Sequence, residues 1–262
     1  MGFEPGWDSA YHFVMAHNHS EQPFYGQDLA YVHGQGFAHY WDGAADWLAE
    51  LARIPGETPY AVDIGCGDGR MLGKLEQRHV PGCGFDVSES FVQAARARGL
   101  EASVADANGL EVPEATLVIA LGEVLAYCNA SGEVALERTI RSSADSLLPG
   151  GSMVFDVTCN DMDASAGWSD GDDWFVAYRN SIVAENYLER RITVFVEENN
   201  GWRRTDEVHR QKLLDTNEVE ALLLECGLRF KRISAMGDVP VLPGRAAYLA
   251  KKPKQARVEG HI

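Results

Sequence analysis

An apolar stretch that leads directly into a glycine-rich turn is the feature that most restricts what this chain folds into. Residues 60–64 are apolar except for Asp63, and Gly65, Gly67 and Gly69 follow at alternate positions before a helical pattern begins. Glycines there let the backbone turn sharply and let a ligand approach the main chain closely. A strand, a tight turn and a helix in this order are typical of α/β sheets that bind ligands beyond the carboxyl ends of their strands.

From residue 60 onward, predicted strands and helices alternate. The strand predictions share a short apolar run and cover residues 60–64, 82–87, 101–104, 115–121, 152–157, 230–234 and 246–251. Helical patterns fill the gaps at residues 68–78, after Ser88, at 133–148 and from Asp215 to Gly227. The run at 115–121 is almost wholly apolar, as expected for a central strand that is buried on both faces. The pattern predicts an α/β fold with a doubly wound, mostly parallel, seven-stranded sheet.

Two segments depart from this alternation. In residues 37–52, apolar positions recur at spacings of three and four, which predicts one long helix that Pro55-Gly56 ends. After the fifth strand, residues 159–172 are polar and indicate a loop, whereas residues 173–214 alternate and contain a turn signal at Asn199-Asn200-Gly201. We therefore expect N-terminal helices and an antiparallel β insert, residues 159–214, called the insert below.

Charge and composition restrict the partners of the chain. Its formal net charge is −16, which repels the phosphate backbone of nucleic acids. The N-terminus lacks the basic start and apolar run of a signal peptide, and no apolar run approaches the length of a membrane span. The five cysteines are odd in number and none are paired at CxxC spacing, which is typical of reduced thiols. We expect a cytoplasmic monomer or homodimer with no nucleic-acid or membrane partner.

Acidic residues follow the next two strands after the glycine turn. Asp86 ends the second strand, where an acid suits a grip on ribose hydroxyls, and Asp106 follows the third, where an acid can accept from an adenine amino group. A helix cap for Asp86 and a turn residue for Asp106 are the alternatives. The glycine spacing is one residue tighter than a dinucleotide GxGxxG motif, and Asp63 would repel a pyrophosphate. An NAD(P)-dependent dehydrogenase is therefore the less favoured alternative.

The stretch from Val62 to Gly69, together with Asp86, Asp106 and the Leu148-Pro149-Gly150-Gly151 turn, resembles class I S-adenosylmethionine (SAM)-dependent methyltransferases over residues 60–158. The resemblance implies that the glycine turn lines the methionine end of SAM, that Asp86 holds the ribose, and that Leu121-Gly122 runs under the sulfonium. The full set of residues implied in cofactor binding is Asp63, Gly65, Cys66, Gly67, Asp86, Val87, Asp106, Ala107, Leu121 and Gly122.

The resemblance also implies how the chain is divided. The predicted units are an N-terminal helical lid (1–54), the SAM-binding core (55–158), the insert as a substrate cover (159–214), a return to the core (215–252) and a tail (253–262). The helices and the insert resemble the small-molecule subset, including glycine and aminosugar N-methyltransferases. The chain lacks the proline-containing signature of DNA amino-methylating enzymes, the Pro-Cys pair of cytosine C5 enzymes and any metal-ligand motif, so we expect a small-molecule acceptor and no metal.

A nitrogen or oxygen nucleophile needs a base to take its proton, and the candidates lie outside the cofactor motifs. His33, near a helix end, is the favoured base, and Tyr31 and Glu123 are the other catalytic candidates. Tyr127 is a further candidate, whereas His39 and His209 are expected to face solvent. The insert contains many aromatic residues that form an acceptor wall or pack the insert on the core: Trp168, Trp174, Phe175, Tyr178, Tyr187 and Trp202. A SAM-binding protein without catalysis shares the same motifs and stays open as an alternative.

Overall fold

The computed structural model describes residues 24–129, 131–199 and 201–254, and its centre is a seven-stranded sheet. The strand order is β10-β13-β5-β4-β1-β2-β3, with β13 antiparallel to both of its neighbours and all other pairs parallel. The strands are β1 (Ala61–Ile64), β2 (Gly82–Asp86), β3 (Glu101–Val104), β4 (Ala115–Ala120), β5 (Leu147–Thr158), β10 (Arg229–Ile233) and β13 (Arg245–Lys251). The predicted doubly wound, mostly parallel sheet is confirmed.

Helices cover both faces of this sheet because its central strand is apolar on both sides. Val118 and Ala120 of β4 pack in a cluster with residues of α5 and α6, whereas Leu117 and Ile119 pack with residues of α2 and α3 on the other face. The helices along the core are α3 (Arg70–Glu76), α4 (Glu89–Ala97), α5 (Leu136–Ser146) and α6 (Thr216–Glu225), with short 3₁₀ turns η2 (Ala107–Gly109) and η3 (Val124–Ala126). Among the described residues, no helix is long and apolar enough to cross a membrane.

The N-terminal segment differs from the single long helix predicted for residues 37–52. It forms α1 (Gln27–Gly36), a 3₁₀ helix η1 (Ala38–Ala44) and α2 (Ala45–Leu51). Phe37, with φ −127° and ψ −24°, breaks the helical path between α1 and η1. The apolar side of this segment still faces the core, as the buried residues Ala44 and Leu48 show. Periodicity therefore located the buried side of this segment correctly but not its helix type.

The insert forms a separate antiparallel sheet in the order β6-β7-β8-β9. Its strands are β6 (Ser165–Asp170), β7 (Trp174–Ala184), β8 (Tyr187–Glu198) and β9 (Gly201–Lys212). The prediction of a loop over residues 159–172 is wrong in part, because β6 pairs with β7 along its whole length. β6 is an edge strand with mostly exposed residues, so its polar composition looks like that of a loop. A two-stranded hairpin, β11 (Ala235–Met236) and β12 (Val239–Pro240), precedes β13.

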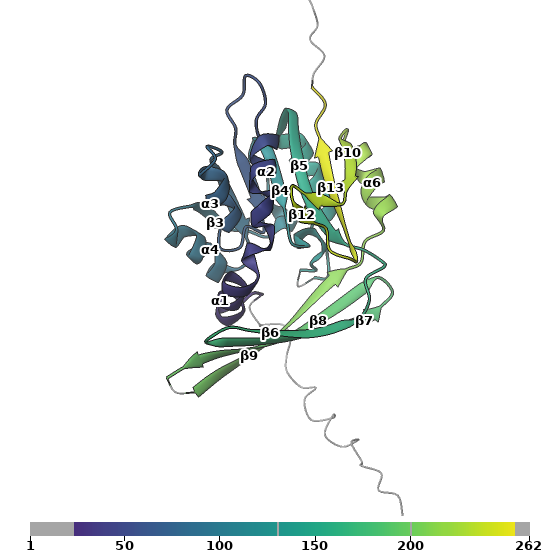
Figure 1. The fold of residues 1–262 in the computed structure, drawn as a ribbon. Coiled ribbons are helices and arrows are strands. Elements are labelled where there is room, and N and C mark those ends of the chain that lie inside the picture. The colour runs from purple at the N-terminus through teal and green to yellow at the C-terminus, as the bar shows by residue number, and fades with distance from the viewer. Residues whose placement is uncertain (1–23, 130, 200, 255–262) are drawn as a thin grey trace, which may run out of the picture.

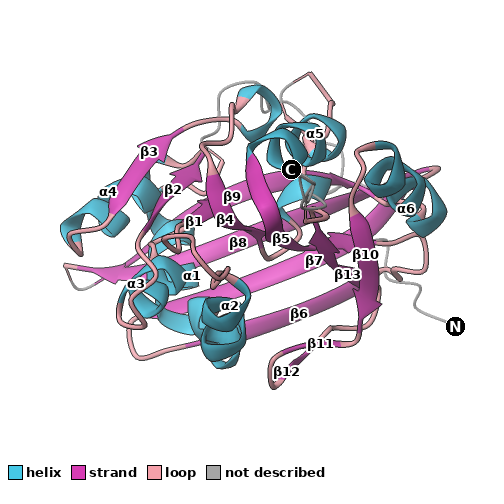
Figure 2. Ribbon diagram, turned by 90° about the horizontal axis from the view of Figure 1, so that it is seen from above, coloured by secondary structure: helices cyan, strands magenta, loops and turns pink. Residues whose placement is uncertain are grey.

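The insert sheet lies across one end of the core sheet, as Figure 1 shows. Seen from above, its long strands pass beneath the core strands and beneath α1 (Figure 2). Leu29 and Val32 of α1 pack against Trp174, Ile192 and Val194 of the insert. Ionic contacts reinforce this packing, because Arg203 of β9 donates two hydrogen bonds to Asp28 of α1. α1 and the insert therefore form one cover over an end of the core.

Candidate active site

A cavity of about 710 Å³ lies where the core, α1 and the insert meet. This volume falls within the range of roughly 300–1,000 Å³ that small-molecule sites occupy. The ten residues predicted to bind the cofactor all line it, as does His33: Asp63, Gly65, Cys66, Gly67, Asp86, Val87, Asp106, Ala107, Leu121 and Gly122. The opposite wall comes from the insert and from the residues that precede α1, including Phe24, Tyr25, Glu189, Glu207 and His209.

The glycine turn forms the core side of the cavity with its backbone. Gly65 has φ +73° and Gly67 has φ +54°, a left-handed conformation that favours glycine. The amides of Gly65 and Cys66 both donate to the carbonyl of Phe85, at 2.7 and 3.1 Å, which fixes the turn to the end of β2. A Cβ atom on Gly65 would overlap the side chain of Val124, whereas one on Gly67 would meet nothing. The close approach at Gly65 joins the turn to the segment that follows β4.

Asp86 connects the end of β2 to the same turn. Its Oδ2 accepts a hydrogen bond from the Gly67 amide at 2.9 Å, and its Oδ1 accepts one from the Ser88 amide at 2.8 Å. Burial raises the pKa of this carboxyl group, and the backbone donors oppose that rise. A carboxylate has about four lone-pair sites, so Asp86 keeps acceptor capacity for a ligand that enters the cavity. The cap-like bond to Ser88 and a role in ligand binding are therefore compatible.

Asp63 brings a buried carboxyl group to the cavity wall. It is 4% exposed, and within the described residues its carboxyl oxygens accept no hydrogen bond. Burial, and secondly the charge of Asp86, raise the pKa of Asp63 to about 8. A ligand cation beside it would stabilise its ionised form. An ammonium group such as that of the methionine part of SAM fits beside these carboxyl oxygens, which accept hydrogen bonds, whereas a pyrophosphate does not.

Two further residues predicted to bind the cofactor, Asp106 and Gly122, follow the ends of β3 and β4. Asp106 is exposed, and its Oδ1 accepts a hydrogen bond from the Asn108 amide at 2.8 Å, which caps η2. Its carboxylate therefore does act as a turn residue while it also lines the cavity. Gly122, with φ +88°, donates its amide to Asp156 at 2.7 Å. The buried carboxylate of Asp156 therefore fixes the backbone that follows β4.

Two of the three catalytic candidates do not line the cavity. Tyr31 is 38% exposed and its hydroxyl donates to Asp173 at 2.6 Å, so it ties α1 to the insert on the outside of the cover. Glu123 is 1% exposed and lies behind the wall in an ionic cluster. Only His33 of the three lines the cavity; burial lowers the pKa of its imidazole, although the Asp68 carboxylate opposes this. Its ring nitrogens make no hydrogen bond within the described residues.

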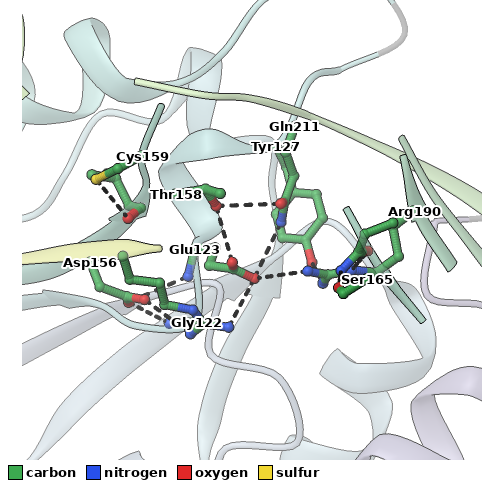
Figure 3. A network of polar contacts seen from close by, with 12 residues as sticks. Gly122, Glu123, Tyr127, Asp156, Thr158, Cys159, Ser165, Arg190 and Gln211 are labelled. Carbon is green, nitrogen blue, oxygen red and sulfur yellow. Dashed lines mark hydrogen bonds and ion pairs between the residues drawn. The ribbon is translucent and has the colours of Figure 1, made fainter. Parts of the chain in front are cut away.

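The ionic cluster around Glu123 joins the core sheet to the insert (Figure 3). Glu123 contacts Arg245 of β13 at 3.1 Å and Arg190 of β8 at 3.5 Å, and accepts hydrogen bonds from Thr158 and Gln211. Arg190 also donates to the hydroxyl of Tyr127, a cavity residue, at 3.3 Å. Side chains that lie far apart in the sequence therefore meet directly behind the cavity wall.

The prediction that His209 faces solvent is wrong. His209 is 2% exposed, lines the cavity and stacks on Phe24 with ring centroids 4.3 Å apart. Its Nε2 lies 2.8 Å from Oε2 of Glu207. The odd-numbered positions of β9 face inward, so an alternation of polar residues that looks like a solvent-facing strand is in fact buried. His39, by contrast, is exposed as predicted.

The aromatic wall also comes from a different part of the chain than expected. None of the six aromatic residues proposed from the insert lines the cavity, and Trp168 and Trp202 are 68% and 55% exposed. The aromatic lining comes instead from residues before and within the N-terminal helices and from the core: Phe24, Tyr25, Phe37, Trp41, Phe85, Phe91 and Tyr127. No group of three or more metal-ligating side chains gathers in the described part of the chain.

Comparison with known proteins assigns the core. Residues 61–151 match the protein family described as "Methyltransferase domain". A curated relative, the putative methyltransferase YqeM of Bacillus subtilis, is 23% identical over 224 residues, which cover 80% of this chain and 88% of the relative. The match over residues 61–151 spans the glycine turn, both acidic strand ends and the segment after β4.

Two solved structures share the fold over most of the chain. The S-adenosylmethionine-dependent methyltransferase from Clostridium acetobutylicum has a TM-score of 0.69 at 17% identity, over 86% of this chain and 97% of its own. SAM-bound CalS10, an amino pentose methyltransferase from Micromonospora echinaspora, has a TM-score of 0.67 at 19% identity, over 88% of this chain and 99% of its own. Both likenesses cover more of the chain than the matched domain at residues 61–151.

The strand order and the glycine turn at the end of β1 define a Rossmann-like, class I methyltransferase fold. Residues 61–151 are a methyltransferase domain, and the fold that surrounds them is that of SAM-dependent methyltransferases. The dehydrogenase alternative is thereby excluded, and SAM is the cofactor.

Proposed function

We propose that this enzyme transfers the methyl group of SAM to a nitrogen or oxygen atom of a small molecule held between the core and the insert. The observation that carries the proposal is the cavity itself, because one wall consists of the glycine turn and the acidic strand ends and the other of α1 and the insert. When bound, SAM supplies a methyl group on a sulfonium, which a nucleophile displaces in line. The chain aligns the acceptor with that group and excludes water from it.

The residues proposed for the cofactor divide along the strand ends. Gly65, Gly67 and Asp63 are assigned to the methionine part, and Asp86 to the ribose hydroxyls. Ala107 and Asp106 are assigned to adenine, with Leu121-Gly122 below the reacting centre. What supports this assignment is that these residues share one cavity and that Asp63 and Asp86 retain acceptor capacity for ammonium and hydroxyl donors.

The acceptor class is supported by charge and by the neighbouring structures. A net charge of −16 disfavours a nucleic-acid substrate, and CalS10 is described as an amino pentose methyltransferase. The test is incubation with tritiated SAM and a mixed small-metabolite extract, followed by separation of low-mass compounds from protein and nucleic acid. Label in the low-mass fraction supports the proposal. Label in DNA, RNA or protein, or a gel shift of nucleic acid below ~100 μM protein at low salt, contradicts it.

The ribose assignment has its own test. Asp86→Ala is expected to weaken SAM binding by roughly 10- to 150-fold, which corresponds to the ~1.5–3 kcal/mol of hydrogen bonds to a charged group. Isothermal titration with SAM and S-adenosylhomocysteine measures it. Ser88→Ala is the matched control, because Ser88 lies next to Asp86 in the fold but does not line the cavity. The change removes the cap of α4, where Ser88 accepts from the Phe91 amide at 3.3 Å, and the hydrogen bond from Ser88 to the Tyr25 carbonyl at 2.7 Å. Equal affinities for the Asp86→Ala variant and the unaltered enzyme would remove Asp86 from the cofactor site.

A further inference from the structure

Two adjacent inward-facing side chains of β9 form a buried carboxylate–imidazole pair at the cavity. Glu207 and His209 are 4% and 2% exposed, and Oε2 of Glu207 lies 2.8 Å from Nε2 of His209. Both residues line the cavity. The mechanism so far leaves this pair without a role, and the sequence pattern of β9 gave it none.

The surroundings of Glu207 determine which of the two side chains carries the shared proton. Glu207 accepts two further hydrogen bonds, from the backbone amides of Tyr25 and Gly26, each at 2.9 Å. A carboxylate that accepts from two amides acts as an acceptor toward the imidazole as well, so Nε2 of His209 is the donor. In a neutral imidazole the other nitrogen, Nδ1, is then a bare acceptor. Glu207 thus fixes both the tautomer and the orientation of the ring.

Nδ1 of His209 is buried and has no hydrogen-bond partner among residues 24–129, 131–199 and 201–254. A buried acceptor without a partner is costly, and such atoms in folded proteins usually have a functional reason. The described aromatic neighbours of the ring donate nothing to Nδ1: Phe24 stacks on the ring, whereas Tyr25, at 4.9 Å, and Tyr127, at 5.8 Å, direct their hydroxyls toward each other. Arg190, its register partner on β8, directs its guanidinium to Asn180, Tyr127 and Glu123 instead. An N–H or O–H of a ligand that reaches this nitrogen would complete the site.

We infer that His209 is the general base of the methyl transfer and that Glu207 is its positioning residue. This inference rests on the proposed function, since it assigns the atom that receives the acceptor's proton. The acceptor's lone pair forms the new bond to the methyl carbon, and the carbon–sulfur bond breaks with its electron pair remaining on sulfur. The proton of the acceptor N–H or O–H passes to Nδ1 of His209 and from there to solvent after product release.

His33 is the competing candidate, and the structure separates the two. Both histidines line the cavity, but His33 has no carboxylate partner and no hydrogen bond to its ring in the described residues. A base that is oriented by a third group is the arrangement that activates a proton acceptor in enzymes. Among the described histidines, this arrangement is present at His209.

The first experiment does not require the acceptor. Nitrogen-15 histidine labelling of the full chain, with long-range proton–nitrogen NMR at pH 8, reports the tautomer of each imidazole, and His209→Gln assigns the signal. We expect a single Nε2–H tautomer with an unprotonated Nδ1. An Nδ1–H tautomer, or a doubly protonated ring at this pH, would overturn the inference even if the enzyme transfers methyl groups.

The second experiment measures turnover of tritiated SAM with the small-metabolite extract. His209→Gln keeps an amide donor toward Glu207 but has no base, so the rate should fall by ~10²-fold or more while S-adenosylhomocysteine binds within about twofold. His33→Gln should lower the rate less, and the exposed His39→Gln should match the unaltered enzyme. A rate lost in His33→Gln but kept in His209→Gln contradicts the inference. If the unaltered enzyme labels no low-mass compound, the proposed function fails, and the NMR result still decides on the tautomer.

The positioning role of Glu207 has a readout that a purely structural residue would not change. In Glu207→Gln the negative charge next to the imidazole is lost, so the acidic limb of the pH–rate profile should move to lower pH. The other groups that face the ring are Tyr25, Tyr127 and Arg190, and none of them is altered in this variant. A lower rate with an unmoved limb would mean that Glu207 only holds the backbone of Tyr25 and Gly26.

Discussion

The two walls of the cavity differ in whether main-chain or side-chain atoms form them. The core wall is built largely by the main chain, where Gly65 and Gly67 adopt left-handed conformations next to the ends of buried apolar strands. The insert wall is built by side chains, because Glu207, His209 and Gln211 extend from one face of β9 and are almost fully buried. A wall made by the backbone requires particular residues at particular positions, whereas a wall made by side chains depends on what the strand packs against. The first kind is visible in the sequence, and the second is not.

The largest expected effect concerns the junction of the two walls. Glu123→Ala leaves Arg190 without a carboxylate and Arg245 with Asp156 alone, in a nearly inaccessible cluster. Removal of one partner from such a buried ionic group costs about 3–5 kcal/mol, so the free energy of unfolding should fall by that amount. Denaturant unfolding measures it, with Glu123→Gln as the control that keeps the volume and one acceptor. A loss below ~1 kcal/mol would show that the insert and the core are not coupled through this cluster.

The core wall should respond to glycine substitutions according to position. Gly67→Ala costs roughly 1–2 kcal/mol, the price of a left-handed backbone for a residue with a Cβ. Gly65→Ala adds overlap with Val124 and should cost ~1–3 kcal/mol more. Unfolding and SAM titration both measure the difference. In the double variant Gly65→Ala/Val124→Ala the extra cost should largely disappear, and if it persists, the contact with Val124 is not its cause.

The pH dependence of stability tests the buried carboxyl group of the core wall. In the folded chain the pKa of Asp63 is raised to about 8, whereas in the unfolded chain it has its ordinary value near 4. Between these values the folded state keeps a proton that the unfolded state has lost, so this group lowers the free energy of unfolding as the pH rises.

The Asp63→Asn variant has no titrating group at this position. Its free energy of unfolding minus that of the unaltered enzyme should therefore be at least ~1 kcal/mol larger at pH 8 than at pH 5. Denaturant unfolding at both pH values, without SAM, measures this gain. Parallel stability curves for the two proteins would mean that Asp63 is ionised in the folded enzyme throughout this range.

The smallest effect is expected on the outer face of the insert. Trp202 lies on the even-numbered, outward face of β9 and is 55% exposed. Trp202→Ala should change the free energy of unfolding by no more than ~0.5 kcal/mol and leave SAM turnover unchanged, as is usual for surface substitutions. Together with His209→Gln it compares the two faces of one strand. A loss of turnover in Trp202→Ala would place part of the acceptor site on the outside of the insert.

The sequence by itself determined the core and the residues proposed to hold the cofactor. Strands such as Ala115–Ala120 are apolar on both faces, and that pattern has one solution, a sheet covered by helices on both sides. The turn from Gly65 to Gly69 needs positive φ angles that other residues adopt only at a cost, so its glycines marked the loop directly. The two acids at the following strand ends were located by the same local logic. These features depend on the preferences of single residues and of their close neighbours in the sequence.

Only the tertiary structure decided the face of β9, the place of Tyr31 and the partners of Glu123. A period of two distinguishes the faces of a strand but does not say which face is buried, and the Glu207-His209-Gln211 face is polar, so it resembled a surface. Tyr31 and Asp173 meet because α1 packs on the insert. Glu123 meets Arg190 and Arg245 because the segment after β4 converges with two distant strands, β8 and β13, behind the cavity. Such contacts join residues far apart in the chain, and their free energy depends on burial, which the residue types alone do not specify.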